Sequence, residues 1–139
     1  MKKRFLALMA GLAMLLCAAP VFADEAWVTV PYAQNGNGWW SGLALVNQSG
    51  EDLDVTIYRT DIGSGPWKIV YQGVVPARGM DTKLLPEFFK LLPYPTENGG
   101  RVSLNINAVG PKAKQHFRVV LFTGGPDGGF GFESYDHDD

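Results

Sequence analysis

Apolar and polar residues alternate along most of the chain after residue 24, with the period of two that is typical of β-strands. The clearest alternation lies in residues 53–59 and 101–109, where Leu53 and Val55 point to one face and Asp54 to the other. Further short segments of this kind end at Gly, Pro, Asn or Ser, which favour turns. The pattern predicts an all-β protein, an antiparallel β-sandwich of about seven to eight strands.

Residues 39–47 are the segment around which we expect the rest to be organised. Two adjacent tryptophans lead into Leu43-Ala44-Leu45-Val46, an apolar run without a polar residue. Such a run is typical of a strand covered on both faces, so we predict a central strand. Gly42 leaves room for a bulge or for the close approach of another backbone. Asn47 and the residues after it end the strand.

Other patterns predict the remaining elements. Pro31 places residues 26–32 in an edge strand, because proline donates no ladder hydrogen bond. Gly73 predicts a bulge within the strand 67–75. Residues 101–109 and 115–123 are expected to pair as a hairpin. Residues 86–92 are the one helical segment, with proline at its first position and apolar residues at helical spacing, and we expect this helix to plug one end of the sandwich.

The first 23 residues have the three-part pattern of an export signal. Residues 2–4 are basic, residues 5–19 are apolar, and residues 21–23 form a cleavage site. We expect cleavage after Ala23, which leaves a single β-sandwich domain over residues 24–135 and a flexible acidic tail over residues 136–139. The sequence thus predicts a periplasmic or secreted bacterial protein.

Two alternatives to a cleaved signal are disfavoured. The apolar run of 15 residues is shorter than the ~20 residues that a spanning helix needs, which argues against an uncleaved anchor. We therefore expect no integral membrane segment after cleavage. A lipoprotein would attach its lipid at Cys17, but Leu16 stands where a small residue would be expected.

Removal of the signal changes the charge and the chemistry of the chain. The full sequence has 12 Lys and Arg and 14 Asp and Glu, and the signal holds three of the basic residues, so 9 remain against 14. A net charge of about −5 argues against nucleic-acid binding, which depends on neutralising phosphates. The single cysteine leaves with the signal, so no disulfide, thiolate nucleophile or cysteine metal site is expected.

Catalytic residues are scarce. The two histidines are His116 and His137, and no Gly-x-Ser-x-Gly motif accompanies them, so a serine triad is disfavoured and His116 is interpreted as a surface residue. Paired carboxylates could hydrolyse glycosides, but the spacing of the candidates pairs none of them: Asp81, Glu87, Glu97 and Glu133. We therefore predict that the protein is not an enzyme and has no cofactor.

The acidic tail has ligand atoms that suit a divalent cation. A metal site needs ligands held in a fixed geometry, and residues 136–139 lie together on a chain end expected to be flexible. We predict no metal site there.

Aromatic residues are the more informative surplus. The predicted binding residues are Trp39, Trp40, Tyr58, Trp67 and Tyr71, because tryptophan and tyrosine are enriched at binding sites. Trp39 and Trp40 are adjacent in an extended segment, so they must point to opposite faces and at most one can lie in a given core. The other is a candidate binding platform, and the alternative is that it packs under a loop or against the helix.

Three short patterns stand out within residues 39–84. They are Trp40-x-Gly42-Leu43-x-Leu45-x-Asn47-x-Ser49, Val55-Thr56-Ile57-Tyr58 and Val75-Pro76-Ala77-Arg78-Gly79. Together they resemble a known family of small bacterial β-sandwich domains, those of the sensory-rhodopsin-transducer type. The resemblance implies the fold alone. The export signal departs from the cytoplasmic transducer, so a role in photosensing is not carried over.

These observations predict an exported, non-enzymatic binding or accessory module. Its partner is expected to be a protein, with carbohydrate as the alternative, recognised through exposed aromatics and the loops 35–38, 61–66 and 93–100. The second hypothesis is a structural or assembly subunit, in which the terminal strands 26–32 and 130–135 complement a neighbouring molecule.

Overall fold

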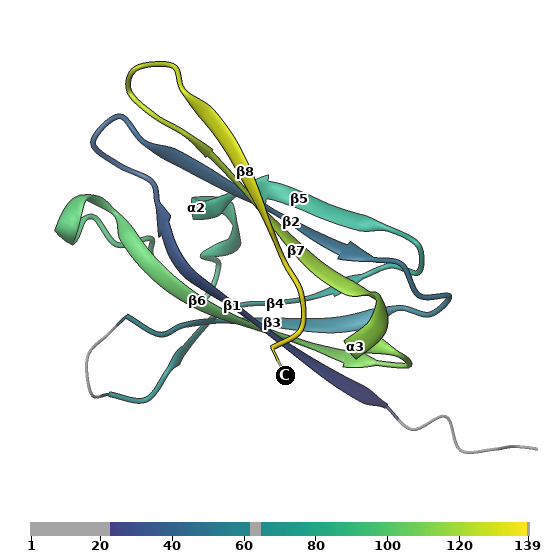
Figure 1. Ribbon diagram of the computed structural model, residues 1–139. Helices are drawn as coiled ribbons and strands as arrows, with labels where there is room; N and C mark the ends of the chain where they lie inside the picture. Colours follow the sequence, from purple (N-terminus) through teal and green to yellow (C-terminus); the bar gives the residue numbers. More distant parts are fainter. Residues whose placement is uncertain (1–22, 62–64, 139) are drawn as a thin grey trace, which may run out of the picture.

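The computed structural model describes residues 23–61 and 65–138, which form two stacked antiparallel β-sheets (Figure 1). The first sheet has the order β1-β6-β3-β4 and the second has the order β5-β2-β7-β8. The predicted all-β sandwich is thus confirmed. The strands are β1 (Asp24–Gln34), β2 (Trp40–Asn47), β3 (Leu53–Arg59), β4 (Lys68–Val75), β5 (Met80–Leu84), β6 (Arg101–Gly110), β7 (Phe117–Gly124) and β8 (Phe130–Tyr135).

The core lies between the two sheets and is built from the alternating residues of the strands. Leu53, Val55 and Ile57 of β3 are fully buried, as their period of two predicts. The apolar residues of β6 from Val102 to Ala108 behave in the same way. Short helical pieces join the strands: α2 (Leu85–Phe88), the 3₁₀ turn η1 (Glu97–Gly99) and α3 (Ala113–His116). In the described residues no helix is both long and apolar enough to span a bilayer.

The central position of β2 is confirmed, since β5 and β7 flank it along its length. Leu43 and Leu45 enter the core, and Ala44 is also buried although it points to the outer face. A small side chain between two flanking strands is covered by its neighbours, so the unbroken apolar run does not require a second covering layer.

The predicted hairpin of residues 101–109 and 115–123 is wrong. β6 pairs with β1 and β3 in the first sheet, whereas β7 pairs with β2 and β8 in the second. Gly110 and the short helix α3 carry the chain from one sheet to the other. Because both strands bury an apolar face, the pattern within them fits pairing with any strand of the sandwich.

β4 has an irregularity, but not at Gly73 as predicted. Gly73 lies in register opposite Val55, and the irregularity falls instead between the pairs Ile57–Tyr71 and Tyr58–Ile69. Val70 and Tyr71 consequently both point into the core. Gly73 is needed for space, because a Cβ on this residue would lie 2.3 Å from the Tyr71 hydroxyl oxygen.

The helix predicted over residues 86–92 is shorter. α2 ends at Phe88, and the backbone amides of Lys90 and Leu91 donate to the Val70 carbonyl oxygen, at 3.0 and 3.1 Å, in place of helical bonds. Tertiary pairing with β4 therefore ends the helix. Phe88 is fully buried and Phe89 nearly so, and α2 lies between the layers in Figure 1.

Asn47 ends β2 through a buried hydrogen-bond network. Its Nδ2 donates to the carbonyl oxygens of Glu51 and Val75 at 2.8 and 3.1 Å, and its Oδ1 accepts from the Ser49 amide and hydroxyl. The predicted role of Asn47 at the end of the strand is confirmed, and the network also ties β2 to the first sheet.

The chain end returns to the first sheet. Beyond β8, the Asp138 amide donates to the Trp27 carbonyl oxygen at 2.8 Å, and Thr29 Oγ1 donates to Asp138 Oδ2 at 2.6 Å. Residues 136–138 therefore lie along the outer edge of β1, and the flexibility expected for the acidic tail stays a prediction. The predicted export signal, up to residue 22, lies outside the described residues.

Candidate functional site

The five predicted binding residues are separated by the fold. Tyr71 is 6% exposed and belongs to the core. Trp39 and Trp40 are 42% and 40% exposed, so neither indole lies in the core. Tyr58 and Trp67 contact each other on the first sheet, away from the two adjacent tryptophans.

Trp39 and Trp40 each pack over a glycine. A Cβ on Gly124 would lie 2.0 Å from Trp40 Nε1, and a Cβ on Gly125 would lie 3.1 Å from the ring of Trp39. Each indole therefore lies against the backbone at the start of the β7–β8 turn. The two rings pack over different glycines because adjacent residues of an extended chain point to opposite sides.

Trp40 belongs to a larger apolar surface, which we call the aromatic face. It is the outer side of the sheet β5-β2-β7-β8, opposite the core. Trp40 stacks on Phe130 with ring centroids 5.8 Å apart, and Phe130 stacks on Phe122 at 6.4 Å. Phe132 lies directly across from Phe122 in the adjacent strand and is 74% exposed. The aromatic face consists of Trp40, Met80, Leu84, Phe122, Phe130 and Phe132.

The aromatic face is hollowed over Gly42. Trp40, Phe122 and Phe130 line this groove from the side of β7, and Leu84 lines it from the side of β5 together with Thr82, Lys83 and Glu87. A Cβ on Gly42 would lie 3.0 Å from the Lys83 carbonyl oxygen, so the strands approach closely where the side chain is missing. The groove can therefore take an apolar side chain from outside.

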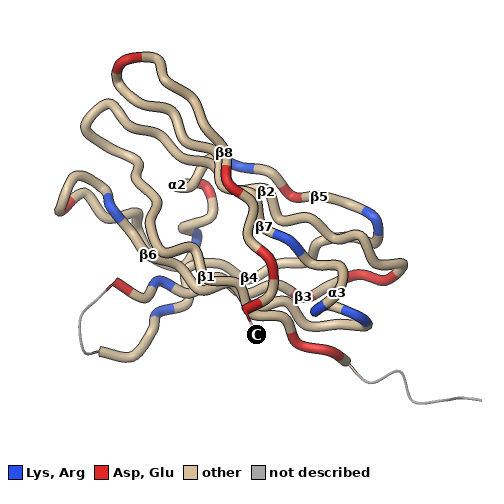
Figure 2. Tube along the Cα trace, in the orientation of Figure 1, with Lys and Arg blue, Asp and Glu red and all other residues tan. Residues whose placement is uncertain are grey.

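Few charges accompany the aromatic face. β2 has no charged residue, β7 has only Arg118, and β8 has only Glu133. β5 has Asp81 and Lys83, which point toward the core side. Figure 2 shows the long uncharged stretches of these strands, with acidic residues at the hairpin tip and along the chain end. The Glu87 carboxylate already accepts a hydrogen bond from the Leu84 amide, with 2.8 Å between Oε2 and the nitrogen. The surface is thus suited to burying apolar groups rather than to binding ions.

The first sheet carries a second aromatic group, which we call the Trp27 cluster. It consists of Trp27, Tyr58 and Trp67, whose ring centroids lie 5.7 to 6.2 Å apart in all three pairs. The rings come from β1, β3 and the segment before β4. Each ring covers part of the other two, although Trp67 stays 50% exposed.

Two of the predicted recognition loops interlock at one end of the sandwich. The Asn35 amide donates to the Gly100 carbonyl oxygen at 3.0 Å, and Gln34 Nε2 donates to the Gly99 carbonyl oxygen at 3.0 Å. Gly100 has a φ of 72°, and a Cβ there would lie 2.0 Å from the Asn35 carbonyl oxygen. Loops 35–38 and 93–100 thus form one rigid unit, while residues 62–64 of the third loop lie outside the described residues.

The ionisable groups with shifted pKa values have structural partners. Burial, together with a 3.0 Å hydrogen bond to Asp81, raises the pKa of Tyr71 to about 12. Burial would raise the pKa of Asp61, but hydrogen bonds from Arg59 and from the Ser103 amide outweigh it and lower that pKa. These groups hold strands and loops together.

The residues of the acidic tail point to separate partners. Asp136 pairs with Arg118, His137 Nδ1 lies 3.0 Å from the Trp27 amide nitrogen, and Asp138 accepts from Thr29. Within residues 23–61 and 65–138, no three His, Cys, Asp or Glu side chains converge as a metal site would require.

Five of the six residues of the aromatic face were not among the predicted binding residues, which included only Trp40. Phe122 lies in a strand whose residues are apolar on both faces, so the sequence does not distinguish its outer face. The alternation of Phe130, Gly131 and Phe132 was a usable signal, because it places two large rings on one face of a strand with no apolar residue opposite.

No match to the chain was found among protein-family models, curated proteins or solved structures. The resemblance to domains of the sensory-rhodopsin-transducer type is neither supported nor contradicted by these comparisons, and it stays a prediction.

Proposed function

We propose that this protein is an exported, non-enzymatic binding module that recognises a protein partner through the aromatic face. The observation that carries the proposal is the exposure of five large apolar side chains, beside the half-buried Phe122, on one side of one sheet. Phe130 and Phe132 are 63% and 74% exposed although they are phenylalanines. Contiguous apolar surface of this kind marks interaction sites in soluble proteins.

The shape of the aromatic face favours a protein over a carbohydrate. The groove over Gly42 is open and lined by four large apolar side chains, with Thr82, Lys83 and Glu87 on the side of β5. A sugar needs several polar groups around a stacking ring, whereas an aromatic or aliphatic side chain of a protein needs only an apolar pocket with a polar rim. We infer that one such side chain of the partner enters the groove.

Leu84→Ser tests this proposal with a matched control. Leu84 is 50% exposed on the edge strand β5 of the aromatic face, and Val74 is 51% exposed on the edge strand β4 of the other sheet. Proteins retained from a cell-envelope extract by the immobilised protein are identified and then purified. Leu84→Ser should weaken binding of the purified partner about tenfold, while Val74→Ser should leave it unchanged.

Two outcomes contradict the proposal. Equal loss of binding in both variants would place the interface elsewhere. Binding of oligosaccharides that depends on Trp40 but not on Leu84 would favour carbohydrate as the ligand. Unfolding midpoints of both variants, measured beside the binding, separate loss of the surface from loss of the fold.

A further inference from the structure

We propose that the free edge of β8 pairs with β8 of a second copy of this chain, so that two molecules share one continuous sheet. This inference does not depend on the proposed protein partner. It rests on the four outer edges of the sandwich, three of which are protected against strand addition. Exposed strand edges recruit other strands because their backbone donors and acceptors are unpaired.

The edges formed by β1 and β4 are covered by backbone from elsewhere in the chain. On β1, the Asp138 amide donates a hydrogen bond to the Trp27 carbonyl oxygen. Further along the strand, Pro31 has no amide hydrogen to donate. On β4, the Lys90 and Leu91 amides occupy the Val70 carbonyl oxygen.

The edge formed by β5 is protected differently. This strand has only five residues, and its charged residues Asp81 and Lys83 are paired with Leu45 and Leu43, so they point toward the core side. Charges pointing inward on a short edge strand oppose strand addition.

β8 has less of this protection, because it has one inward-pointing charge where β5 has two. Its residues from Phe130 to Ser134 are exposed, and within the described residues no backbone segment other than β7 pairs with it. Glu133 is its one charged residue. The strand therefore presents unpaired backbone groups together with two exposed phenylalanines.

The hydrogen-bonding register identifies which groups are free. The Gly125 amide donates to the Gly129 carbonyl oxygen at 2.8 Å, which makes these residues a hydrogen-bonded pair. Such pairs alternate along an antiparallel ladder. Gly131 and Glu133 therefore bond to β7, while the backbone groups of Phe130, Phe132 and Ser134 face outward.

An antiparallel pair of β8 strands centred on Phe132 uses all of these outward groups. Phe132 then faces Phe132 of the second copy, and Phe130 faces Ser134, which gives about six backbone hydrogen bonds. Glu133 faces Gly131 of the second copy. A shift centred on Glu133 would instead place like charges opposite each other, which is unfavourable.

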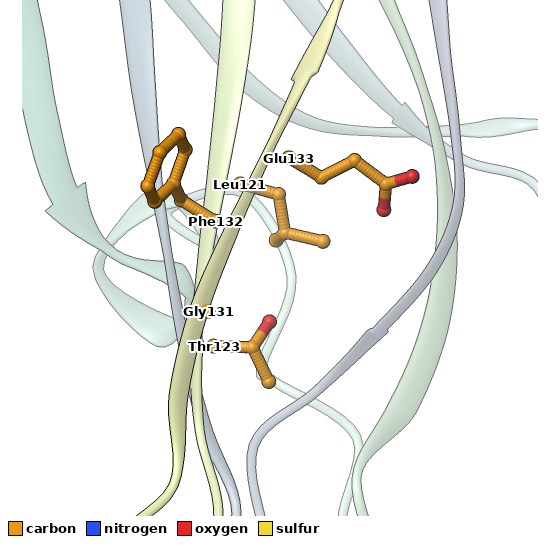
Figure 3. Close-up of a pocket in the computed structure, with 5 residues that line it drawn as sticks. All are labelled: Leu121, Thr123, Gly131, Phe132 and Glu133. Carbon is orange, nitrogen blue, oxygen red and sulfur yellow. The ribbon is translucent and has the colours of Figure 1, made fainter.

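The inner side of β8 has room for this arrangement. An open hollow lies there, lined by Leu121, Thr123, Gly131 and Glu133, while Phe132 points to the opposite side (Figure 3). No atom lies within 4 Å of the Cβ position of Gly131. The Glu133 side chain of the second copy can therefore lie over Gly131. A second copy, rather than an arbitrary strand, is favoured because each empty Gly131 position matches a Glu133.

Sedimentation equilibrium of the purified protein, with variants at two positions, tests the inference. The unaltered protein should show a concentration-dependent dimer of twice the chain mass. Ser134→Pro removes an outward amide that β7 does not use, and it should abolish the dimer. Ser134→Ala keeps this amide and should dimerise normally.

The charge at residue 131 provides a second test, which does not depend on how a proline affects folding. In Gly131→Glu the new carboxylate faces Glu133 of the second copy, and the symmetry of the dimer gives two such repulsive pairs. In Gly131→Lys the same two places hold attractive pairs. The dissociation constant should rise roughly 2- to 30-fold in the first variant and fall by a similar factor in the second. A protein that stays monomeric at all concentrations, or a dimer that these substitutions do not affect, would overturn the inference.

Discussion

The aromatic face and the Trp27 cluster show that exposed rings on a sheet can have different physical roles. In the Trp27 cluster each of three rings contacts both others, at 5.7 to 6.2 Å between centroids. In the aromatic face the rings stack in a row, Trp40 on Phe130 and Phe130 on Phe122, and Phe132 lies beyond them. A closed cluster stabilises itself, whereas an open row leaves surface for another molecule.

The positions of the residues explain this difference. Trp27 and Tyr58 lie on strands that flank β6, whose outward residues Asn105 and Asn107 are small enough to let the large rings meet over them. Phe122 and Phe132 instead lie directly opposite each other on adjacent strands, and β8 is the last strand of its sheet. Phe132 consequently has no neighbouring strand on its other side.

The largest expected difference between the two groups is in stability. Trp27→Ala removes two ring contacts and the apolar surface that they bury, and it should lower the free energy of unfolding by about 2 kcal/mol, roughly half the effect of a fully buried tryptophan. Phe132→Ala should change it by less than about 0.5 kcal/mol, because the ring is mostly in water. Denaturant unfolding measures both. Equal losses would show that the aromatic face is as cohesive as the Trp27 cluster.

The contact between Trp40 and Gly124 should have the next largest effect on the free energy of unfolding. In Gly124→Ala the new Cβ would overlap the indole, so the ring must leave its position against Phe130. We expect a loss of about 1 kcal/mol in unfolding free energy, at the lower end for overpacking because the ring is half exposed and can move. A change in tryptophan fluorescence should accompany it.

Gly131→Ala is the matched control for Gly124→Ala. It adds the same methyl group to the neighbouring strand, where no atom lies within 4 Å. This variant should be neutral or slightly more stable. If Gly124→Ala and Gly131→Ala behaved alike, the contact between Trp40 and the backbone of β7 would have no energetic weight.

Tyr71 lies in the core and belongs to neither of the two aromatic groups. Because burial and the hydrogen bond to Asp81 raise the pKa of its folded state to about 12, the folded protein holds this proton more tightly than the unfolded chain. The stabilising contribution is therefore fully present below pH ~10 and is lost as the pH rises toward 12. Tyr71→Phe should remove one late step from the alkaline phenolate titration and cost about 1 kcal/mol at neutral pH. An unchanged titration curve would contradict the buried position.

The fold was predictable where a local rule decides it. Alternation fixed the inward residues of β3, and Asn47 marked the end of β2. The errors came from interactions between distant segments. The partner of β6 depends on the path of the whole chain, and α2 ends early because Lys90 and Leu91 bond to β4. No pattern of a few residues contains these contacts.

The candidate site was less predictable for the same reason. Trp40 was identified from its residue type, but Leu84, Phe122 and Phe132 become one surface only when β5, β7 and β8 take their places beside β2. Tyr71 was included because tyrosines are common at interfaces, and a bulge in β4 turned it inward. Residue type indicates what a side chain can do, and sheet order decides whether it is accessible.

The smallest effect concerns the chain end that borders the Trp27 cluster. Removal of residues 136–139 deletes the Asp138 bonds to Trp27 and Thr29, both near the surface, and should lower the unfolding free energy by about 0.5 to 1 kcal/mol. The local effect should be clearer, because the Trp27 amide loses its contact with His137 Nδ1 and its hydrogen exchange should accelerate. The Val28 amide, which points toward β6 on the other side of the same strand, is the internal control and should keep its protection. Unchanged exchange at Trp27 would mean that the tail does not cover β1 in solution, and this edge would then be as open to strand addition as that of β8.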